Sequence, residues 1–453
     1  MEKRTVNIIS SFEGKFKNIK DINKKRIIFL SVFIVVLNSM IMPMIFEGDS
    51  FSKVVIMGGI FTLPLVVLIN CNEINCFNTK SRKYYMMLFV VGASFIFNSI
   101  VYKVIGYLAI GLIFCFVIPI INYIVFKTEV NVIYVVTKSI CIFFIIFMIA
   151  SLIIGPPLNY GQYSAIVGNP NRLAELIIIV VPSCLIQIKY YFEIKNKRYI
   201  FFLIELSLVV SVCLFTNSRI AFISTLVQIV FFVYYLFFYN KYQKNISLKI
   251  ILKVVVCALL VLFITFIATF YAFTAVKVYM IEKFPKVQMS LQYDELSGND
   301  MFCIVGNRYT RGIGENNNDE FTSGRISIWR NFAKDVGLLG HADEGISVEE
   351  GGRSYAKTTA HNVYLQIAYS SGITAGIVML IFMASIALNI ICKCINIAKG
   401  ENIDSNTCFS ILIALGFGLE SMTASCYMMY TYLPATFFYC TICYLVANRG
   451  DGR

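Results

Sequence analysis

Long apolar runs separated by short polar segments follow one another along nearly the whole chain. Most runs hold roughly 18 or more residues, and a helix of about 20 residues, rising about 1.5 Å per residue, crosses a hydrocarbon core of about 30 Å. Such runs have the length and composition of helices that lie in lipid. The pattern therefore predicts an all-α, polytopic integral membrane protein with about twelve transmembrane helices.

Hydropathy and flanking charge place these helices along the chain. One of them, near residues 362–392, is long enough to break at the Ser370-Ser371-Gly372 step. The others are expected near residues 27–46, 52–71, 84–102, 104–126, 132–154, 173–189, 199–216, 219–239, 250–274, 407–426 and 430–448.

Composition supports a membrane fold and explains the charge. Of 453 residues, 58% are hydrophobic and only 14% are charged, whereas soluble domains hold about 25% charged residues. The formal net charge of +13 raises the question of a nucleic-acid partner. With the N-terminus inside, however, the cytoplasmic segments collect about 23 Lys and Arg and the short outer loops about four, Lys53, Lys103, Arg172 and Arg219. The positive-inside rule therefore places both termini in the cytoplasm, and no nucleic-acid partner is expected.

The spans and their orientation divide the chain into five regions. These are a basic cytoplasmic tail (1–26), nine membrane helices (27–274), a large extracytoplasmic loop (275–360), three membrane helices (361–448) and a second cytoplasmic tail (449–453).

The large extracytoplasmic loop is too long for a plain connection. After Ser323, a residue type that caps helices, one face repeats Trp329, Phe332, Ala333 and Val336 at helical spacing, and polar residues fill the other face. We expect a short helix here that lies on the outer membrane surface.

Cysteines and acids give no sign of a metal or disulfide framework. Most of the fourteen cysteines lie in apolar runs or beside cytoplasmic loops, and only Cys303 falls in the large loop. The external acids occur as adjacent pairs, whose side chains point apart, rather than as a converging cluster. We therefore expect neither a metal nor another cofactor in the site.

Four groups on the outer side stand out as candidate chemistry: Arg172, Arg219, Arg325 and His361. They come from different loops, and each lies at or near the start of a helix, so a bundle could gather them into one site. Arginines near a membrane can also simply reach lipid headgroups. Arg325 opposes the dipole of its own helix unless an anion is bound, and a helix N-terminus with a guanidinium is suited to phosphate.

The two histidines are expected to differ in role. An imidazole titrates near neutral pH, so His361, where the loop meets a membrane helix, suits a general base. His341 is flanked by flexible, acidic sequence and is expected to be a solvated loop residue. Polar residues inside the spans could instead mark a transport path, and we add only Glu420 to the site; the group is Asn98, Lys138, Glu205, Gln228 and Glu420.

At these motifs the sequence resembles the O-antigen ligase and polymerase superfamily of bacterial membrane glycosyltransferases. The shared pattern runs from about residue 159 to 376 and rests on order and spacing. It comprises G-N-P-N (168–171), T-x-S-R (216–219), S-G-R-x-x-x-W (323–329), H-N-x-x-L (361–365) and a glycine-rich helix (372–376). Two positions depart from the pattern, Ile220 in place of a small residue and HADEG at 341–345 in place of a segment with an early glycine.

The resemblance implies transfer of a glycan from a polyprenyl (undecaprenyl) diphosphate carrier to an acceptor hydroxyl, with inversion, at the outer face of the bacterial cytoplasmic (inner) membrane. The chemistry of the residues agrees with this reaction: we expect His361, Arg325 and Arg219 to be catalytic, and Arg172, Asn362, Trp329 and Glu420 to bind the substrate. Membrane lipid, a flippase and a chain-length regulator of the same pathway are the implied partners.

Three functions stay open at this point. The chain could polymerise surface polysaccharide such as capsule, or could be a ligase that attaches glycan to lipid A core or to protein. Its Ile-, Asn- and Lys-rich composition is typical of an AT-rich genome and favours the polymerase, because a bacterium without an outer membrane has no lipid A core. A lipid-linked glycan transporter or flippase is the rival of another class, but its charges should line a central cavity.

Overall fold

A computed structural model describes most of the helical part of the chain. The described residues are 21–45, 79–127, 131–154, 158–159, 162–216, 218–243, 259–273, 325–342, 344–350, 353–357, 359–424, 428–429 and 431–446, with single residues at 275 and 279. The chain forms two compact units. Unit 1 comprises residues 1–139, 325–395 and 403–453, and unit 2 comprises residues 140–324 and 396–402.

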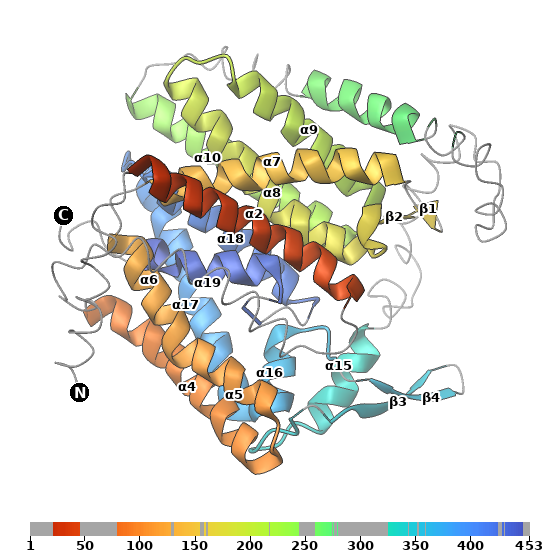
Figure 1. Ribbon diagram of the computed structural model, residues 1–453. Coiled ribbons are helices and arrows are strands. Elements are labelled where there is room, and N and C mark those ends of the chain that lie inside the picture. Colours follow the sequence, from red (N-terminus) through yellow and green to blue (C-terminus); the bar gives the residue numbers. More distant parts are fainter. Residues whose placement is uncertain are drawn as a thin grey trace. The chain divides into compact units, whose positions relative to one another are not determined.

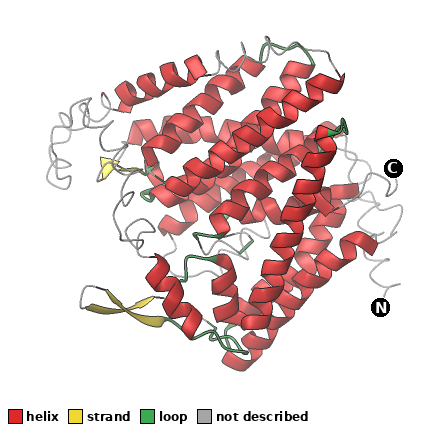
Figure 2. Ribbon diagram, turned by 180° about the vertical axis from the view of Figure 1, so that it is seen from behind, coloured by secondary structure: helices red, strands yellow, loops and turns green. Residues whose placement is uncertain are grey.

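Helices dominate both units, as the hydrophobic pattern predicts (Figure 2). Among the described residues, seven helices are long and apolar enough to cross a membrane: Ser81–Tyr102, Ile105–Tyr123, Val132–Ile154, Pro170–Glu193, Tyr199–Thr216, Arg219–Phe238 and Ile373–Ala398. The chain is thus a multi-pass α-helical protein. The predicted span at 52–71 lies outside the described residues, and the number twelve stays a prediction.

Unit 1 contains most of the C-terminal helices and part of the N-terminal ones (Figure 1). Its helices are α2 (Asp21–Ile45), α4 (Thr79–Tyr102), α5 (Ile105–Leu112), η1 (Ile113–Val117), α6 (Ile118–Lys127), the start of α7 (Val132–Ile154), α15 (Arg325–Lys334), α16 (Val363–Ser371), α17 (Ile373–Ala398, up to residue 395), α18 (Ser405–Ser421) and α19 (Leu433–Val446).

Buried side-chain amides join helices of unit 1 that are distant in sequence. The Asn122 amide donates to the Tyr439 carbonyl at 2.6 Å, and its oxygen accepts from the Cys443 N–H at 2.8 Å, so α6 is fastened to α19. The Asn389 amide donates to the Tyr84 hydroxyl at 2.6 Å, which places the last part of α17 beside the start of α4. Since unpaired polar groups are costly in an apolar bundle, these bonds fix which helices are neighbours.

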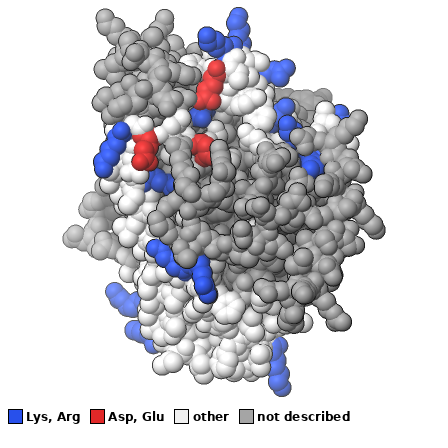
Figure 3. All heavy atoms as spheres, turned by 90° about the vertical axis from the view of Figure 1, so that its left-hand side faces the viewer, with Lys and Arg blue, Asp and Glu red and all other residues white. Residues whose placement is uncertain are grey.

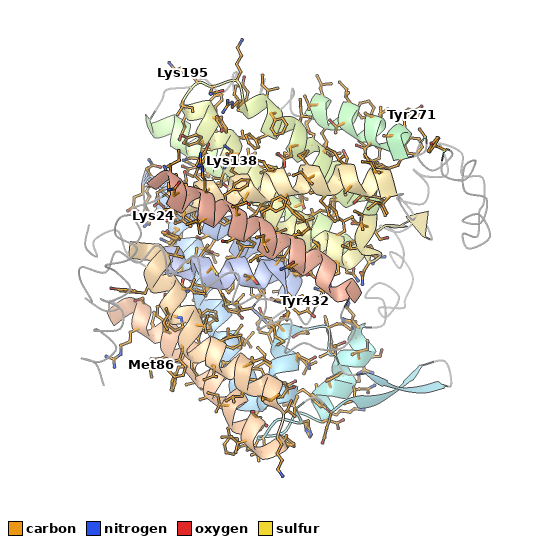
Figure 4. All side chains as sticks on the ribbon, in the orientation of Figure 1. Lys24, Met86, Lys138, Lys195, Tyr271 and Tyr432 are labelled. Atoms are coloured by element: carbon orange, nitrogen blue, oxygen red, sulfur yellow. The ribbon has the colours of Figure 1, made fainter. Side chains whose placement is uncertain are left out.

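Two lysines lie on neighbouring helices of unit 1. The Ser139 hydroxyl donates to the Phe29 carbonyl at 2.8 Å, so α2 and α7 lie side by side. Lys24 and Lys138 lie in the first parts of these two helices (Figure 4). Figure 3 shows the left-hand side of Figure 1, on which many Lys and Arg side chains but few Asp and Glu side chains are visible.

Unit 2 is built around a nearly buried helix, α8 (Pro170–Glu193), of whose membrane-spanning part 89% of residues are buried. It also contains the remainder of α7, strands β1 (Leu158–Asn159) and β2 (Gln162–Tyr163), the 3-10 turn η2 (Ala165–Val167), α9 (Tyr199–Thr216), α10 (Arg219–Gln243) and a helix at Leu259–Phe273. Tyr163 packs against Phe273 with their ring planes tilted by 31° and 4.4 Å between ring centroids, which anchors the β1–β2 turn to this helix.

Two short antiparallel strand pairs accompany the helices. β1 pairs with β2, and in the large loop β3 (Ile346–Glu350) pairs with β4 (Arg353–Lys357). In the second hairpin Ile346 pairs with Lys357 and Glu350 with Arg353. β1 and β2 have two residues each, and β3 and β4 have five. The period-2 pattern of such short strands is a weak signal beside long apolar helices.

Candidate active site

The predicted break in the tenth span is confirmed. Part of the large loop binds to the backbone at this break. α16 ends at Ser371, Gly372 has φ of +99°, and α17 begins at Ile373. A break leaves the last carbonyls of α16 without helical partners. Residues 337–342 lie against it and supply backbone hydrogen bonds: His341 N–H to Tyr369 O at 2.8 Å, Ala342 N–H to Ser370 O at 3.2 Å, and in return Ile373 N–H to Gly337 O at 3.0 Å.

Two glycines permit this close approach of backbones. A Cβ on Gly340 would lie 2.0 Å from the Ser370 carbonyl oxygen, and one on Gly372 would lie 2.3 Å from the Leu338 oxygen. The break is also supported from α4, since the Asn98 amide donates to the Ser371 carbonyl at 3.1 Å. Asn98 is therefore explained by a structural contact, and a transport path is not needed to account for it.

His341 is not the solvated loop residue that the sequence suggests. Its ring stacks on Tyr369 at 4.8 Å and is half-buried, and its Nε2 lies 2.6 Å from the Asp335 carbonyl oxygen. The flanking polar sequence misled the prediction, because the backbone bonds of residues 337–342 hold the ring against α16.

The amphipathic helix of the large loop is confirmed as α15, but its buried face differs from the predicted one. Ile328 and Phe332 are buried, whereas Ala333 is exposed. Phe332 packs edge to face on Tyr369 at 4.8 Å. The predicted cap, Ser323, lies outside the described residues.

This buried face joins an apolar cluster, which we call the loop core: Ile328, Phe332, Ile346, Ala360 and Tyr369, with Val336 and Leu365 packed against it. α15, α16 and the β3–β4 hairpin consequently lie together (Figure 1). The apolar face of α15 is thus covered by protein, and the position of α15 at the membrane surface stays a prediction.

Arg325 and Trp329 begin α15 on one side of the loop core. They are one helical turn apart, as are Arg325 and the buried Ile328. Burial lowers the pKa of the Arg325 guanidinium from its ordinary value, although an arginine stays charged at neutral pH. Among the described residues no carboxylate pairs with Arg325. The buried Nε1–H of Trp329 also has no hydrogen-bond acceptor among the described residues. A partly desolvated cation and an indole donor are both suited to a ligand that offers oxygen atoms.

His361 lies in a rigid turn directly before α16. It has φ of +51°, a conformation that costs free energy for residues other than glycine, so the surroundings must hold it. Asn362 caps α16 by accepting from the Leu365 N–H at 3.0 Å, and its amide donates to the Met422 carbonyl at 3.1 Å. On the other side, the Gln366 side chain accepts from the Ala360 N–H at 2.7 Å.

The imidazole of His361 is half-buried, and its Nε2 lies 3.4 Å from the Thr359 hydroxyl. Because Ala360 belongs to the loop core together with Ile328, the turn of His361 and the start of α15 border the same cluster. The structure therefore brings Arg325, Trp329, His361 and Asn362 into one part of unit 1.

Glu420 lies near the same turn, at the end of α18. The Tyr364 and Ser421 hydroxyls are 3.1 Å apart, and with the Asn362–Met422 bond they hold the end of α18 against the start of α16. Glu420 is itself only 4% exposed. Glu420 therefore lies close to the cap of α16, and its assignment to the site stays a prediction.

The two other predicted arginines belong to unit 2. Arg172 forms an ion pair with the buried Glu175 at 3.1 Å, the pair that their spacing suggests. Arg219 is the first residue of α10 and is partly exposed. Short turns join α8 to α9 and α9 to α10, so α8 and α10 run in the same direction.

A buried hydrogen bond fixes how α8 and α10 are aligned along their axes. The Gln228 amide donates to the Ile178 carbonyl at 3.0 Å. At about 1.5 Å per residue, Arg219 lies about 14 Å from this bond along α10 and Arg172 about 9 Å along α8, both toward the helix starts. The two arginines are therefore at the same end of unit 2, and Gln228 fastens two helices, which accounts for it without a transport path.

Two residues that sequence reasoning missed support the site. Gln366 braces the His361 turn, and its amide also donates to the Ser370 hydroxyl at 3.0 Å near the helix break. Gly340 permits the docking of residues 337–342. For Gln366 the sequence holds a signal, a polar residue directly after the H-N-x-x-L motif in a mostly apolar helix. The sequence around Gly340 holds no signal that separates it from a flexible loop glycine.

Part of the chain matches a known protein family. Residues 204–380 match the family model described as O-antigen ligase. The resemblance to the O-antigen ligase and polymerase superfamily is confirmed. No curated protein matches the chain.

The matched O-antigen ligase region begins in α9 and ends in α17, so it includes Arg219, Arg325, Trp329, His361 and Asn362. It contains residues of both units. Arg172 and Glu420 lie outside it. The chain is accordingly a multi-pass membrane protein that is similar to the O-antigen ligase family over residues 204–380.

Proposed function

We propose that this protein transfers oligosaccharide units from a polyprenyl diphosphate carrier to an acceptor hydroxyl at the outer face of the cytoplasmic membrane. The observation that carries the proposal is the O-antigen ligase match over residues 204–380, within which the rigid His361 turn and the start of α15 border one cluster. A general base and a desolvated guanidinium are the two groups that such a transfer needs.

In the proposed reaction His361 takes the proton of the acceptor hydroxyl, whose oxygen attacks the anomeric carbon of the donor sugar. The bond from that carbon to the phosphate oxygen breaks, and the electron pair leaves with the diphosphate. The anomeric centre is inverted because attack and departure occur on opposite faces. No redox partner is needed.

Charge develops on the departing diphosphate, and Arg325 is the group of unit 1 that we propose to stabilise it. Arg219, in unit 2, is the second candidate for this role on its sequence motif alone. A guanidinium binds phosphate oxygens in a bidentate manner, which a lysine cannot reproduce. The N-terminal N–H groups of α15 add to the electrostatic effect of Arg325. Arg172 already pairs with Glu175, so it is the weaker candidate for phosphate binding. We assign Trp329, Asn362 and Glu420 to the binding of the sugar.

The acceptor we propose is the growing glycan, which makes the protein a polymerase of surface polysaccharide. The Ile-, Asn- and Lys-rich composition favours this choice over a lipid A core acceptor. A ligase that uses the same chemistry on a different acceptor is the outcome that the experiment must separate.

The test is the length distribution of surface glycan on a gel, in a strain deleted for this protein and complemented with variants. We expect a ladder with wild type and single repeats with the deletion and with His361→Ala. The matched control is His341→Phe, which keeps an aromatic ring stacked on Tyr369 and removes the second imidazole; it should give the wild-type ladder.

A wild-type ladder from His361→Ala, at equal amounts of protein in the membrane, would contradict the proposed base. If the deletion still makes polymer on the lipid carrier but the polymer does not reach its final acceptor, the protein is a ligase.

A further inference from the structure

A group of metal-ligating side chains lies inside unit 2, apart from the proposed catalytic residues. Cys141 of α7, Cys184 of α8 and Glu205 of α9 offer two sulfur atoms and a carboxylate oxygen, all within 4.8 Å of one another. The three side chains are almost completely buried, with exposures of 0%, 0% and 2%. Three helices that are separate in sequence thus converge on one point.

Glu205 makes this group different from ordinary buried cysteines. Neither of its carboxylate oxygens has a hydrogen-bond partner within the described residues, and both are shielded from solvent. A charged carboxylate without hydrogen bonds costs several kcal/mol in an apolar interior, and even a neutral one loses its bonds to water. The buried carboxylate therefore calls for either a proton or a cation.

The spacing of the two sulfur atoms suits a cation. The Cys141 and Cys184 Sγ atoms are 3.7 Å apart. Two thiolates at about 2.3 Å from a tetrahedral zinc ion lie about 3.8 Å from each other. The separation is far longer than the bond of about 2.05 Å in a disulfide.

We propose that Cys141, Cys184 and Glu205 bind a zinc ion that fastens α7, α8 and α9 together within unit 2. Mixed sulfur and oxygen donors fit zinc, whereas copper(I) prefers sulfur alone and magnesium prefers oxygen alone. Binding releases the two thiol protons. The two thiolates and the Glu205 carboxylate then carry three negative charges against the two positive charges of the ion, so the site keeps one net negative charge. The fourth position is left for a small ligand such as water.

This site is independent of the proposed glycan transfer. Its residues lie along the lengths of the three helices, and Arg172 and Arg219 lie at the start of α8 and of α10. The role assigned to the ion is to hold helices in place, which gives it a readout other than activity.

The experiment measures metal in full-length protein purified in detergent without added zinc, by mass spectrometry of the elements. We expect about one zinc per chain in wild type and almost none in Cys141→Ser, Cys184→Ser and the double variant. Glu205→Gln should bind zinc more weakly, with loss at a lower chelator concentration. The matched control is Cys213→Ser, since Cys213 is a buried thiol of α9, the helix that carries Glu205, and its Sγ lies 3.9 Å from the Thr225 hydroxyl.

A second measurement keeps the proposal testable if a variant folds poorly. Wild type grown with cobalt in place of zinc should show thiolate-to-cobalt charge-transfer absorption in the near ultraviolet, and Cys213→Ser should show the same band.

Three results would overturn the proposal. They are wild-type protein without stoichiometric zinc and without the cobalt band, zinc that is retained by the Cys141→Ser, Cys184→Ser double variant, and a disulfide between the two cysteines. The first would mean that Glu205 is protonated and the thiols only pack against each other.

Discussion

At the scale of single residues, Arg325 combines partial burial with a lack of ion pairs among the described carboxylates. Such a cation is poorly compensated until an anion binds. The same helix carries Arg330, which is exposed. The contrast between these two arginines separates a binding role from general surface charge.

We expect Arg325→Gln to lower the rate of glycan transfer by about 100-fold or more, because a donor to the developing diphosphate charge is lost. Arg325→Lys should recover only part of the rate, since an ammonium cannot bind phosphate in a bidentate manner. The measurement is transfer in membranes with a lipid diphosphate-linked donor. Arg330→Gln is the control and should keep the wild-type rate. Equal rates for Arg325→Gln and wild type would contradict the proposed role.

Gly340 lets residues 337–342 of the large loop pack closely against the end of α16, because it has no side chain. We expect Gly340→Ala to lower the free energy of unfolding by about 1–3 kcal/mol, because the new Cβ would collide with the Ser370 carbonyl oxygen. Thermal unfolding in detergent measures this effect. Gly106→Ala is the matched control, since nothing lies within 4 Å of a Cβ there, and it should leave stability unchanged or slightly higher. If both variants unfold alike, the docking of residues 337–342 is not a constraint.

At the scale of elements, α15 is held by its packing in the loop core. A helix of ten residues is marginal by itself in water. Its order therefore depends on Ile328 and Phe332 packing against α16 and β3. The His361 turn leads directly into Asn362, the N-cap of α16. The same packing therefore positions both His361, the proposed general base, and the guanidinium of Arg325.

We expect Phe332→Ala to cost about 3–5 kcal/mol in the loop core and to release α15 from α16. Limited proteolysis of membranes should then cut the large loop faster than in wild type, while the membrane helices stay protected. Transfer should fall together with this protection. Ala333→Ser, on the exposed side of the same helix, should change neither property. A Phe332→Ala protein that resists protease as wild type does would show that α15 is held by other contacts.

At the scale of the whole molecule, the sequence predicts that the large loop is outside and both termini are inside. Lys334 is an exposed residue at the end of α15, and Lys399 is an exposed residue just after α17. One long apolar helix, α17, separates the region of α15 from Lys399. The predicted orientation therefore puts these two lysines on opposite sides of the membrane.

The orientation can be tested by labelling intact cells with a maleimide that does not cross membranes. We expect Lys334→Cys to be labelled in intact cells and Lys399→Cys only after the cells are permeabilised. The protein without either substitution serves as the background for its native cysteines. The reverse pattern would invert the topology and remove the site from the outer face.

Hydrophobic length, charge bias and local motifs are enough to predict part of this protein. Apolar runs predict the helices, because in lipid a spanning backbone satisfies its polar groups by helical hydrogen bonds. The Ser370-Ser371-Gly372 step predicts the break between α16 and α17. The order of the arginine and histidine motifs was enough to suggest the O-antigen ligase family.

Tertiary structure alone decided which distant residues meet. The loop core, the His341 stack and the bond from Asn98 to Ser371 join segments whose contact has no local signal, because a sequence pattern reports a face of a helix and not its partner. The same is true of Cys141, Cys184 and Glu205. Each reads separately as a buried residue of an apolar run, and only the packing of α7, α8 and α9 brings their sulfur and oxygen atoms within 4.8 Å.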